Sequence, residues 1–358
     1  MPISNIIPLT KKLISIKTDP QNKSQLDEAL NMIISELGDF TVEIFERNGS
    51  RSILAYYGKT RPQNFKVILN GHLDVIPGKS WQYEARIEGD KMYGVGSMDM
   101  KTNDSVMLAV FKDLAPSLDF PLGLQIVTDE EIGGFDGTKY QIEQGVKSDF
   151  TIAGEATNFN VVNRARGIIL AKIISTGKTA HGAYPWRGEN AVEKLISFLS
   201  KLKKEIPNPA SEEWKTSLNI ANIEVPNKSF NKIPDLANCL IDIRYIPEES
   251  SSILERLTKL ASDNHVELKI VANESVLYLD ERDYFIEKIQ SASKEILNKN
   301  SICYGAFGTS DARFFTQFGM KGVEFGLIGG GIGTDQEWVS LQSAEDFYNI
   351  LTKFLRSL

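Results

Sequence analysis

The sequence is poor in histidine and cysteine. Its 358 residues include three histidines, His72, His181 and His265, and two cysteines, Cys239 and Cys303. Two cysteines cannot form a disulfide framework or a cysteine-ligated zinc cluster, and three histidines argue against a histidine-rich metal site. We therefore expect both cysteines to be small, buried core residues.

Two further absences limit the location and the partners of the protein. No stretch reaches the roughly 18 consecutive apolar residues that a membrane span needs, and residues 1–20 lack the order of charges and small residues found in a signal peptide. Acidic residues outnumber Lys and Arg by 47 to 40, which gives a net charge of −7, whereas nucleic-acid binders usually have a basic surface. The sequence predicts a cytoplasmic protein that binds neither nucleic acid nor membrane.

The hydrophobic pattern predicts two domains, as the chain length also suggests. In residues 1–163 and 277–358, apolar strands alternate with amphipathic helices, which is typical of an α/β fold with a mostly parallel central sheet flanked by helices. Residues 164–276 have the order strand–helix–strand–strand–helix–strand of a ferredoxin-like α+β unit. The simplest topology is one α/β domain interrupted by an inserted domain.

Polar clusters end the expected strands, and active sites of α/β sheets lie beyond the carboxyl ends of the strands. His72 and Asp74 follow one strand and share a face because side chains alternate with a period of two. His72 could bind a metal while Asp74 holds its other ring nitrogen, or His72 could simply lie on the surface beside a turn.

Carboxylates end the neighbouring segments. Asp99 follows a Gly-rich loop and precedes a helix, where it could also serve as a cap; that loop lacks the third glycine of a dinucleotide site. Glu130 and Glu131 follow an apolar strand, and such adjacent acids repel one another unless a cation offsets them. One could bind metal while the other acts as a base, although a solvated acidic turn has the same sequence. Glu155 is a lone acid that ends another apolar strand.

In combination these residues match a dinuclear site for divalent metals. The set resembles the acetylornithine deacetylase / succinyl-diaminopimelate desuccinylase family of zinc metallopeptidases and aminoacylases, over nearly the whole chain. The motifs that carry the resemblance are NGHLDVIP (70–77), YGVGSMDMK (93–101), TDEEIGG (128–134), GEAT (154–157), GKTAHGAYPWRGENAV (177–192) and GTSDARFF (308–315).

The resemblance implies a role for each residue of the site. His72, Asp99 and Glu155 would hold one metal ion, and Asp99 would bridge to a second ion held by Glu131. Zn²⁺ is the expected metal, at one or two ions per chain, with Co²⁺ or Mn²⁺ as alternatives. Glu130 would be the general base and Asp74 would orient His72. The peptide bond after Asp99 is expected to be cis.

The resemblance also assigns roles to the inserted domain and to the turn at 308–313. The inserted domain would form a homodimer, and His181 would reach across it to stabilise the oxyanion. The residues expected to bind the substrate, chiefly its carboxylate, are Arg166, Asn231, Arg244, Thr309 and Ser310. Two of these assignments have simpler alternatives: Arg244 could form a structural ion pair, and the turn that contains Thr309 and Ser310 could merely cap a helix.

One ligand of the family pattern is missing. The family has a metal-binding His four residues before a Glu near the C-terminus, and Glu337 matches that Glu, so Gly333 stands where the His should be. Three explanations remain open. Asp335 or water could replace the ligand and favour Mn²⁺ or Mg²⁺; the enzyme could use one metal ion held by three protein ligands; or the chain could be an inactive relative.

The sequence therefore predicts a metal-dependent hydrolase that cleaves the amide bond of an N-acylated amino acid or a small peptide. The alternative is a weakly active or inactive family member that acts as a ligand-binding or regulatory protein.

Overall fold

The computed structural model describes residues 5–358. The chain divides into two compact units. Unit 1 consists of the residues up to Arg164 together with Leu277–Tyr304 and Ser310–Leu358. Unit 2 consists of Ala165–Val276 and Gly305–Thr309. Within residues 5–358, no helix is both long and apolar enough to cross a membrane.

A nine-stranded sheet forms the centre of unit 1, in the order β1-β2-β6-β3-β7-β15-β8-β13, with β14 paired to β8. β6, β3, β7 and β15 run parallel, as expected, and the strands outside them are antiparallel to their neighbours where the register is defined. The strand bounds are β1 Thr41–Arg47, β2 Ser50–Tyr56, β3 Phe65–His72, β6 Leu122–Val127, β7 Ser148–Ala153, β8 Val161–Ala165, β13 Leu277–Tyr278, β14 Cys303–Ala306 and β15 Gly322–Glu324.

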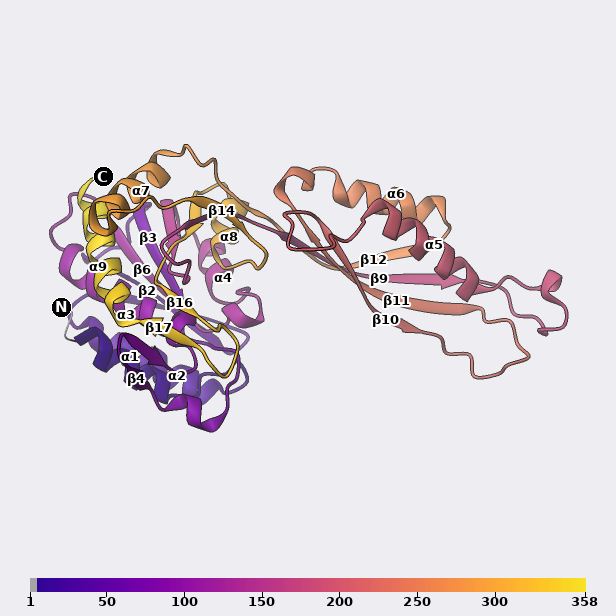
Figure 1. Ribbon diagram of the computed structural model, residues 1–358, viewed down its shortest axis with the longest axis horizontal. Helices are drawn as coiled ribbons and strands as arrows, with labels where there is room; N and C mark the ends of the chain where they lie inside the picture. The colour runs from indigo at the N-terminus through magenta and orange to yellow at the C-terminus, as the bar shows by residue number, and fades with distance from the viewer. Residues whose placement is uncertain (1–4) are drawn as a thin grey trace. The chain divides into compact units, whose positions relative to one another are not determined.

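The parallel strands β3 and β6 are buried along nearly their whole length because helices cover both faces of the sheet (Figure 1). One layer contains α1, α2, α3, α7 and α9 and shares the main core; the other contains the short helices α4 and α8. α3 is buried nearly all round, since 11 of its 13 residues are inaccessible. The helix bounds are α1 Ile6–Ser15, α2 Lys23–Leu37, α3 Thr102–Leu114, α4 Thr138–Glu143, α7 Tyr284–Leu297, α8 Ala312–Gln317 and α9 Leu341–Arg356.

Unit 1 also has a small antiparallel sheet that the sequence pattern did not indicate, in the order β16-β17-β5-β4. Its strands are only two or three residues long, too short for a period-two pattern to be recognised. Their bounds are β4 Arg86–Glu88, β5 Lys91–Tyr93, β16 Gly329–Gly330 and β17 Trp338–Ser340. β17 pairs with β5, so this sheet ties the segment after Gly333 to the loop that carries Asp99.

Unit 2 is an antiparallel sheet in the order β10-β11-β9-β12, with α5 and α6 on one face (Figure 1). Buried and half-buried residues alternate along β9, as in a sheet with one covered face. The bounds are β9 Gly167–Thr176, α5 Ala191–Glu205, β10 Ser217–Glu224, β11 Leu236–Tyr245, α6 Ile253–Asp263 and β12 Glu267–Glu274.

The fold class expected from the sequence is confirmed, and so is the cis peptide bond between Asp99 and Met100. The expectation for the cysteines is half right. Cys239 is buried among the apolar side chains of unit 2. Cys303 is only partly buried, like the other three residues of β14.

Candidate metal centre

The register of the sheet brings three of the expected polar clusters to one edge. His72 is the last residue of β3 and pairs with Val127 of β6, while Asn70 of β3 pairs with Ala153 of β7. The segments that follow β6 and β7 carry Glu130, Glu131 and Glu155. The polar residues therefore lie beyond neighbouring carboxyl ends of parallel strands.

His72, Asp99 and Glu155 form the core of the candidate site. Nε2 of His72 lies 3.0 Å from Oδ1 of Asp99 and 3.8 Å from Oε1 of Glu155. The ligand atoms of all three residues lie within 4.8 Å of one another. One imidazole nitrogen and two carboxylates at this spacing can coordinate a single divalent cation.

The orientation of His72 suits metal binding. Nδ1 lies 2.9 Å from the backbone carbonyl oxygen of Asp74 and 3.5 Å from its carboxylate. A proton on Nδ1 donated to that carbonyl leaves the lone pair of Nε2 facing Asp99 and Glu155. The Asp74 carboxylate has a different task, because it accepts the backbone N–H groups of Glu130 and Glu131 at 3.2 and 2.9 Å.

Glu337 holds the loop that carries Asp99. Its carboxylate is buried and accepts the backbone N–H groups of Gly96, Met98 and Asp99 at 3.1, 2.8 and 3.1 Å. Asp99 itself has a non-helical backbone within the irregular turn Ser97–Lys101. The sequence placed Glu337 in the family pattern but gave no sign of this contact, which joins segments more than 230 residues apart.

The site concentrates negative charge. Burial raises the pKa of Glu130 and of Glu155 well above its usual range, and Asp99 adds repulsion in both cases. Burial alone lowers the pKa of His72, but the adjacent Asp74 and Asp99 carboxylates outweigh it and hold the pKa well above the ordinary value. Such a group of acids around one imidazole is what a bound cation neutralises.

The donor set therefore fits a divalent metal ion. The ammonium group of Lys101, two residues from Asp99, does not supply the missing charge, because it donates to the backbone carbonyls of Leu13 and Ile16. Burial also lowers the pKa of Lys101 to about 7. His72, Asp99 and Glu155 are the residues that would hold the ion, and a mixed nitrogen and carboxylate set suits Zn²⁺ as well as Mn²⁺ or Co²⁺.

Glu130 is distinct among the acids of the site. Its backbone N–H is fixed by Asp74, yet among residues 5–358 no hydrogen bond or ion pair holds its carboxylate. Glu131, in contrast, accepts the backbone N–H of Ile76 at 3.1 Å. The carboxylate of Glu130 is thus free to exchange a proton, whereas that of Glu131 is held by a hydrogen bond.

Two residues near the expected second ligand position lie outside the cluster. Gly333 has a φ of +65°, and a Cβ atom there would lie 3.3 Å from Cδ1 of Ile76. The carboxylate of Asp335 forms an ion pair with Lys79. Neither belongs to the group of mutually close ligand atoms.

His181 and Asn231 lie in adjoining loops of unit 2. The backbone N–H of Gly182 donates to the carbonyl of Asn231 at 2.7 Å, and both side chains are exposed. Nδ1 of His181 accepts the N–H of Ala183 at 3.1 Å, so the neutral ring carries its proton on Nε2, which has no partner among the described residues. Together they form an exposed pair with a free N–H donor and a free amide.

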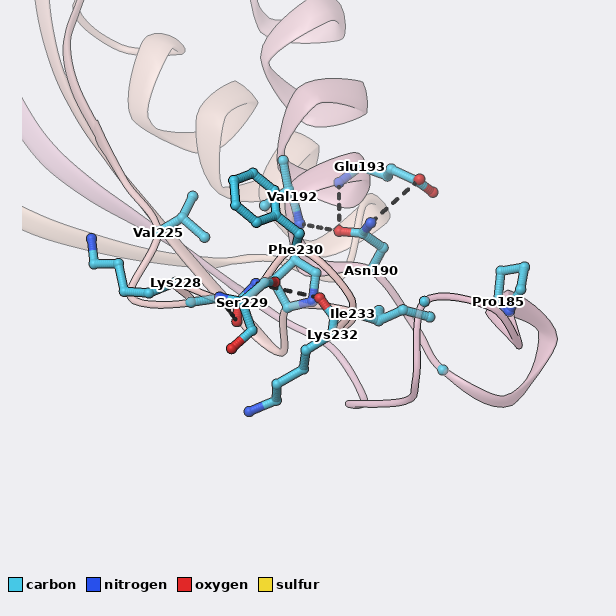
Figure 2. Close-up of a pocket in the computed structure, with 14 residues that line it drawn as sticks. Pro185, Asn190, Val192, Glu193, Val225, Lys228, Ser229, Phe230, Lys232 and Ile233 are labelled. Atoms are coloured by element: carbon cyan, nitrogen blue, oxygen red, sulfur yellow. Dashed lines mark hydrogen bonds between the residues drawn. The ribbon is translucent and has the colours of Figure 1, made fainter.

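A pocket of about 770 Å³ adjoins these loops (Figure 2). Figure 2 shows Asn190 capping α5, with its side-chain oxygen accepting the N–H groups of Val192 and Glu193. Phe230, next to Asn231 in the chain, is fully exposed. The loops around His181 and Asn231 are thus exposed, and hydrogen bonds hold their backbones in place.

Arg166 and Arg244 are both engaged within unit 2. Arg166 donates to the hydroxyl of Ser217 at 2.9 Å and to the carbonyl of Phe307 at 3.2 Å. Arg244 pairs in a bidentate manner with Asp242 at 2.8 and 3.0 Å, the structural ion pair that the sequence left open. Burial, and the charge of Arg244, lower the pKa of Arg166.

The turn at 308–313 contains one free and one engaged hydroxyl. The Thr309 hydroxyl has no hydrogen-bond partner among the described residues. The Ser310 hydroxyl accepts the backbone N–H of Ala312 at 3.3 Å, and it lies near Glu324, a buried acid of β15 whose pKa is raised to about 7 by burial. The sequence analysis missed Glu324, and its only signal was a lone acid in a short apolar strand.

Asp104 is a second buried acid that the sequence analysis missed. Both of its carboxylate oxygens lack hydrogen-bond partners within residues 5–358. It packs against β3, since a Cβ atom on Gly71 would lie 1.9 Å from its Oδ1. Burial raises its pKa well above the usual range, which favours the neutral acid. It lies in the first turn of α3 beside other polar residues, where an acid is common, so the sequence gave no signal for it.

Fold and site together define an α/β protein with an inserted α+β unit and a His–Asp–Glu group, beyond its strand ends, that could hold a metal ion. Residues 68–357 match the model of peptidase family M20/M25/M40. The chain is 30% identical over 323 residues to a succinyl-diaminopimelate desuccinylase from Caulobacter sp. (strain K31), covering 84% of this chain and 82% of that protein. It is 28% identical over 389 residues to the same enzyme of Pelagibacter ubique (strain HTCC1062), with both chains fully covered.

A solved structure shows the same fold. Aminopeptidase PepT from Bacillus cereus ATCC 10987 superposes with a TM-score of 0.78 at 16% identity, covering 99% of this chain and 98% of that one. The chain belongs to the M20/M25/M40 peptidase family, whose members are metal-dependent, and it is a hydrolase.

Proposed function

We propose that the protein hydrolyses the amide bond of an N-acylated amino acid, with an N-succinyl amino acid as the first candidate and small peptides as the second. The observation that carries the proposal is the His72–Asp99–Glu155 cluster beside the free carboxylate of Glu130. The two relatives named as desuccinylases support the choice of an N-acyl substrate.

The metal ion in this proposal is Zn²⁺ held by His72, Asp99 and Glu155, with Co²⁺ or Mn²⁺ as substitutes. When bound, it supplies Lewis acidity for the carbonyl group of the amide and acidifies a neighbouring water molecule. Asp74 fixes the ring of His72 through its backbone carbonyl and, through its carboxylate, holds the backbone that carries Glu130.

Glu130 is the general base. Its carboxylate takes the proton of the attacking water and later gives that proton to the leaving amine. Burial raises the pKa of Glu130 above its usual range, which is the direction that such a proton shuttle requires. The absence of competing hydrogen bonds from the described residues leaves the carboxylate free for both transfers.

Unit 2 contributes to the site of a partner subunit in a homodimer. The Nε2–H group of His181 donates to the oxyanion that develops on the carbonyl oxygen, a role for a preorganised donor. Asn231 and Arg166 bind the carboxylate of the substrate, with Thr309 and Ser310 at the edge of its binding site. Arg244, already paired with Asp242, assists through its charge near Arg166.

The test is a panel of substrates assayed with defined metals. N-succinyl-diaminopimelate, N-acetyl-ornithine, N-acetyl-lysine and dipeptides are incubated with metal-stripped protein and added Zn²⁺, Co²⁺ or Mn²⁺. We expect amine release only with metal and most rapidly from an N-acyl amino acid. If the metal-loaded protein binds these compounds without cleaving any of them, the result instead supports the ligand-binding alternative.

A further inference from the structure

We infer that each chain binds a single catalytic metal ion, through His72, Asp99 and Glu155, and that Glu131 fastens the backbone beside that ion instead of binding a second one. The inference rests on the proposed function and specifies its metal centre. It follows from how the surrounding carboxylates and the neighbourhood of Gly333 are arranged.

Glu131 makes two hydrogen bonds to the segment that follows β3. Its Oε1 accepts the N–H of Ile76 at 3.1 Å, and its own N–H donates to Oδ2 of Asp74 at 2.9 Å. These contacts join the loop after β6 to the segment after β3. Glu131 thus fastens the segment directly after His72 to its own loop, which is a positioning role.

A second ion would lack ligands. Among residues 5–358, His72, Asp99 and Glu155 are the single group of three or more His, Cys, Asp or Glu residues whose ligand atoms are mutually close. A second ion beside Glu131 would share Asp99 and need at least one more ligand, because catalytic zinc sites have three protein ligands.

The residues from which that third ligand would come cannot supply it. Gly333 has no side chain, and a Cβ atom there would lie 3.3 Å from Cδ1 of Ile76. Asp335 is paired with Lys79. Both carboxylate oxygens of Glu337 accept hydrogen bonds from backbone N–H groups. The first ion, in contrast, has three ligands in place.

Metal stoichiometry tests the inference directly. The full-length protein is stripped with a chelator, titrated with Co²⁺ and with Zn²⁺, freed of unbound metal and measured by mass spectrometry, with visible absorption following Co²⁺. We expect saturation at one ion per chain. Saturation at two would overturn the inference while leaving a metal hydrolase. Failure to bind any metal would overturn the proposed function as well.

Two matched variants test the assignment of ligands. Glu131→Gln keeps the oxygen that accepts the N–H of Ile76, so we expect one ion per chain with a Kd within about threefold of wild type. Glu155→Gln removes a ligand, and its Kd should rise well beyond the roughly 10- to 100-fold cost of altering a group that only supports a ligand. If Glu131→Gln weakens metal binding as much as Glu155→Gln while keeping a wild-type circular dichroism spectrum and melting temperature, Glu131 is a ligand and the inference is wrong.

Discussion

The carboxylate of Glu337 accepts the backbone N–H of Asp99 at 3.1 Å, and the same oxygen accepts the N–H of Met98 at 2.8 Å. Its other oxygen accepts the N–H of Gly96. A buried side chain near the C-terminus therefore sets the backbone of a proposed metal ligand. This contact gives the first prediction.

Replacing Glu337 should weaken both the fold and the metal centre. Glu337→Ala leaves three N–H donors unpaired and should lower the free energy of unfolding by about 3 kcal/mol or more. Metal affinity should fall roughly 10- to 100-fold, as for other groups that hold a ligand in place. Glu337→Gln is the matched control, because its amide oxygen can still accept the N–H groups of Met98 and Asp99. This variant should lose less unfolding free energy and less metal affinity than Glu337→Ala. Urea unfolding and metal titration measure the two effects, and equal losses in both variants would contradict the prediction.

Removing the proposed base should separate catalysis from metal binding. Glu130→Gln should keep one metal ion per chain, because the Glu130 side chain is outside the ligand group. Its kcat should fall about 10²- to 10⁴-fold, the range for a lost general base. Steady-state kinetics and metal analysis on the same preparation test this, and near-normal turnover would remove Glu130 from the mechanism.

Two inactive variants should complement each other if the site is shared between subunits. Heterodimers are prepared by co-expressing Glu130→Gln and His181→Ala chains with different tags. Each heterodimer would hold one site with both residues intact, so its activity should reach about half that of wild type in a two-fold dimer. The parent homodimers are the controls. Heterodimers as inactive as both parents, or a monomer by light scattering, would contradict the role of His181 in a partner site.

Adding a ligand at Gly333 should create a second metal position. The backbone at Gly333 has a φ of +65°, and a Cβ atom there would lie 3.3 Å from Cδ1 of Ile76. Both Gly333→His and Gly333→Ala should therefore lower the stability. Of the two variants, only Gly333→His adds a nitrogen donor at the position where the family pattern has its ligand, so it should bind a second Co²⁺ or Zn²⁺ ion. Gly333→Ala, which has the same strain, should bind one. A stoichiometry of one in both folded variants would show that Gly333 is not the missing position.

Metal removal should destabilise the protein without unfolding it. The apolar core of unit 1 does not depend on the ion, so the stripped chain should keep its circular dichroism spectrum. A ligand that binds only the folded state stabilises it by about 4 kcal/mol at 1,000 times its Kd, so Zn²⁺ should raise the melting temperature by several degrees. The His72→Ala variant should lose most of this rise. A rise of equal size in that variant would point to binding elsewhere.

Much of the site could be predicted because its residues follow strands with an unmistakable apolar pattern. β3, β6 and β7 are largely buried strands with mostly apolar centres, and parallel strands place their carboxyl ends at one edge. His72, Glu130 and Glu155 were therefore expected near one another. Asp99 was expected there from its place in the resemblance, and its 3.0 Å approach to His72 needed the fold of its loop.

The supporting acids could not be predicted in the same way. Glu324 lies in a three-residue strand and Asp104 in a buried helix, and neither has a local pattern that separates it from an ordinary solvated acid. The role of Glu337 depends on the pairing of β17 with β5, two strands too short to leave a periodic signal. The contact between Nδ1 of His72 and the carbonyl oxygen of Asp74 could not be predicted either, because it depends on the path of the backbone after β3.

The sequence by itself determined the fold class and the chemical types at the strand ends, because hydrophobic periodicity and residue identity are local properties. It also determined that no side chain exists at Gly333. Only the tertiary structure decided which acids are free and which are held. Glu130 has no side-chain partner in the part of the chain that the structure describes, whereas Glu131 accepts from Ile76, Asp335 pairs with Lys79 and Glu337 accepts from the Asp99 loop. Those assignments depend on hydrogen bonds between segments distant in the chain, and the packing of the sheet and its loops brings those segments together.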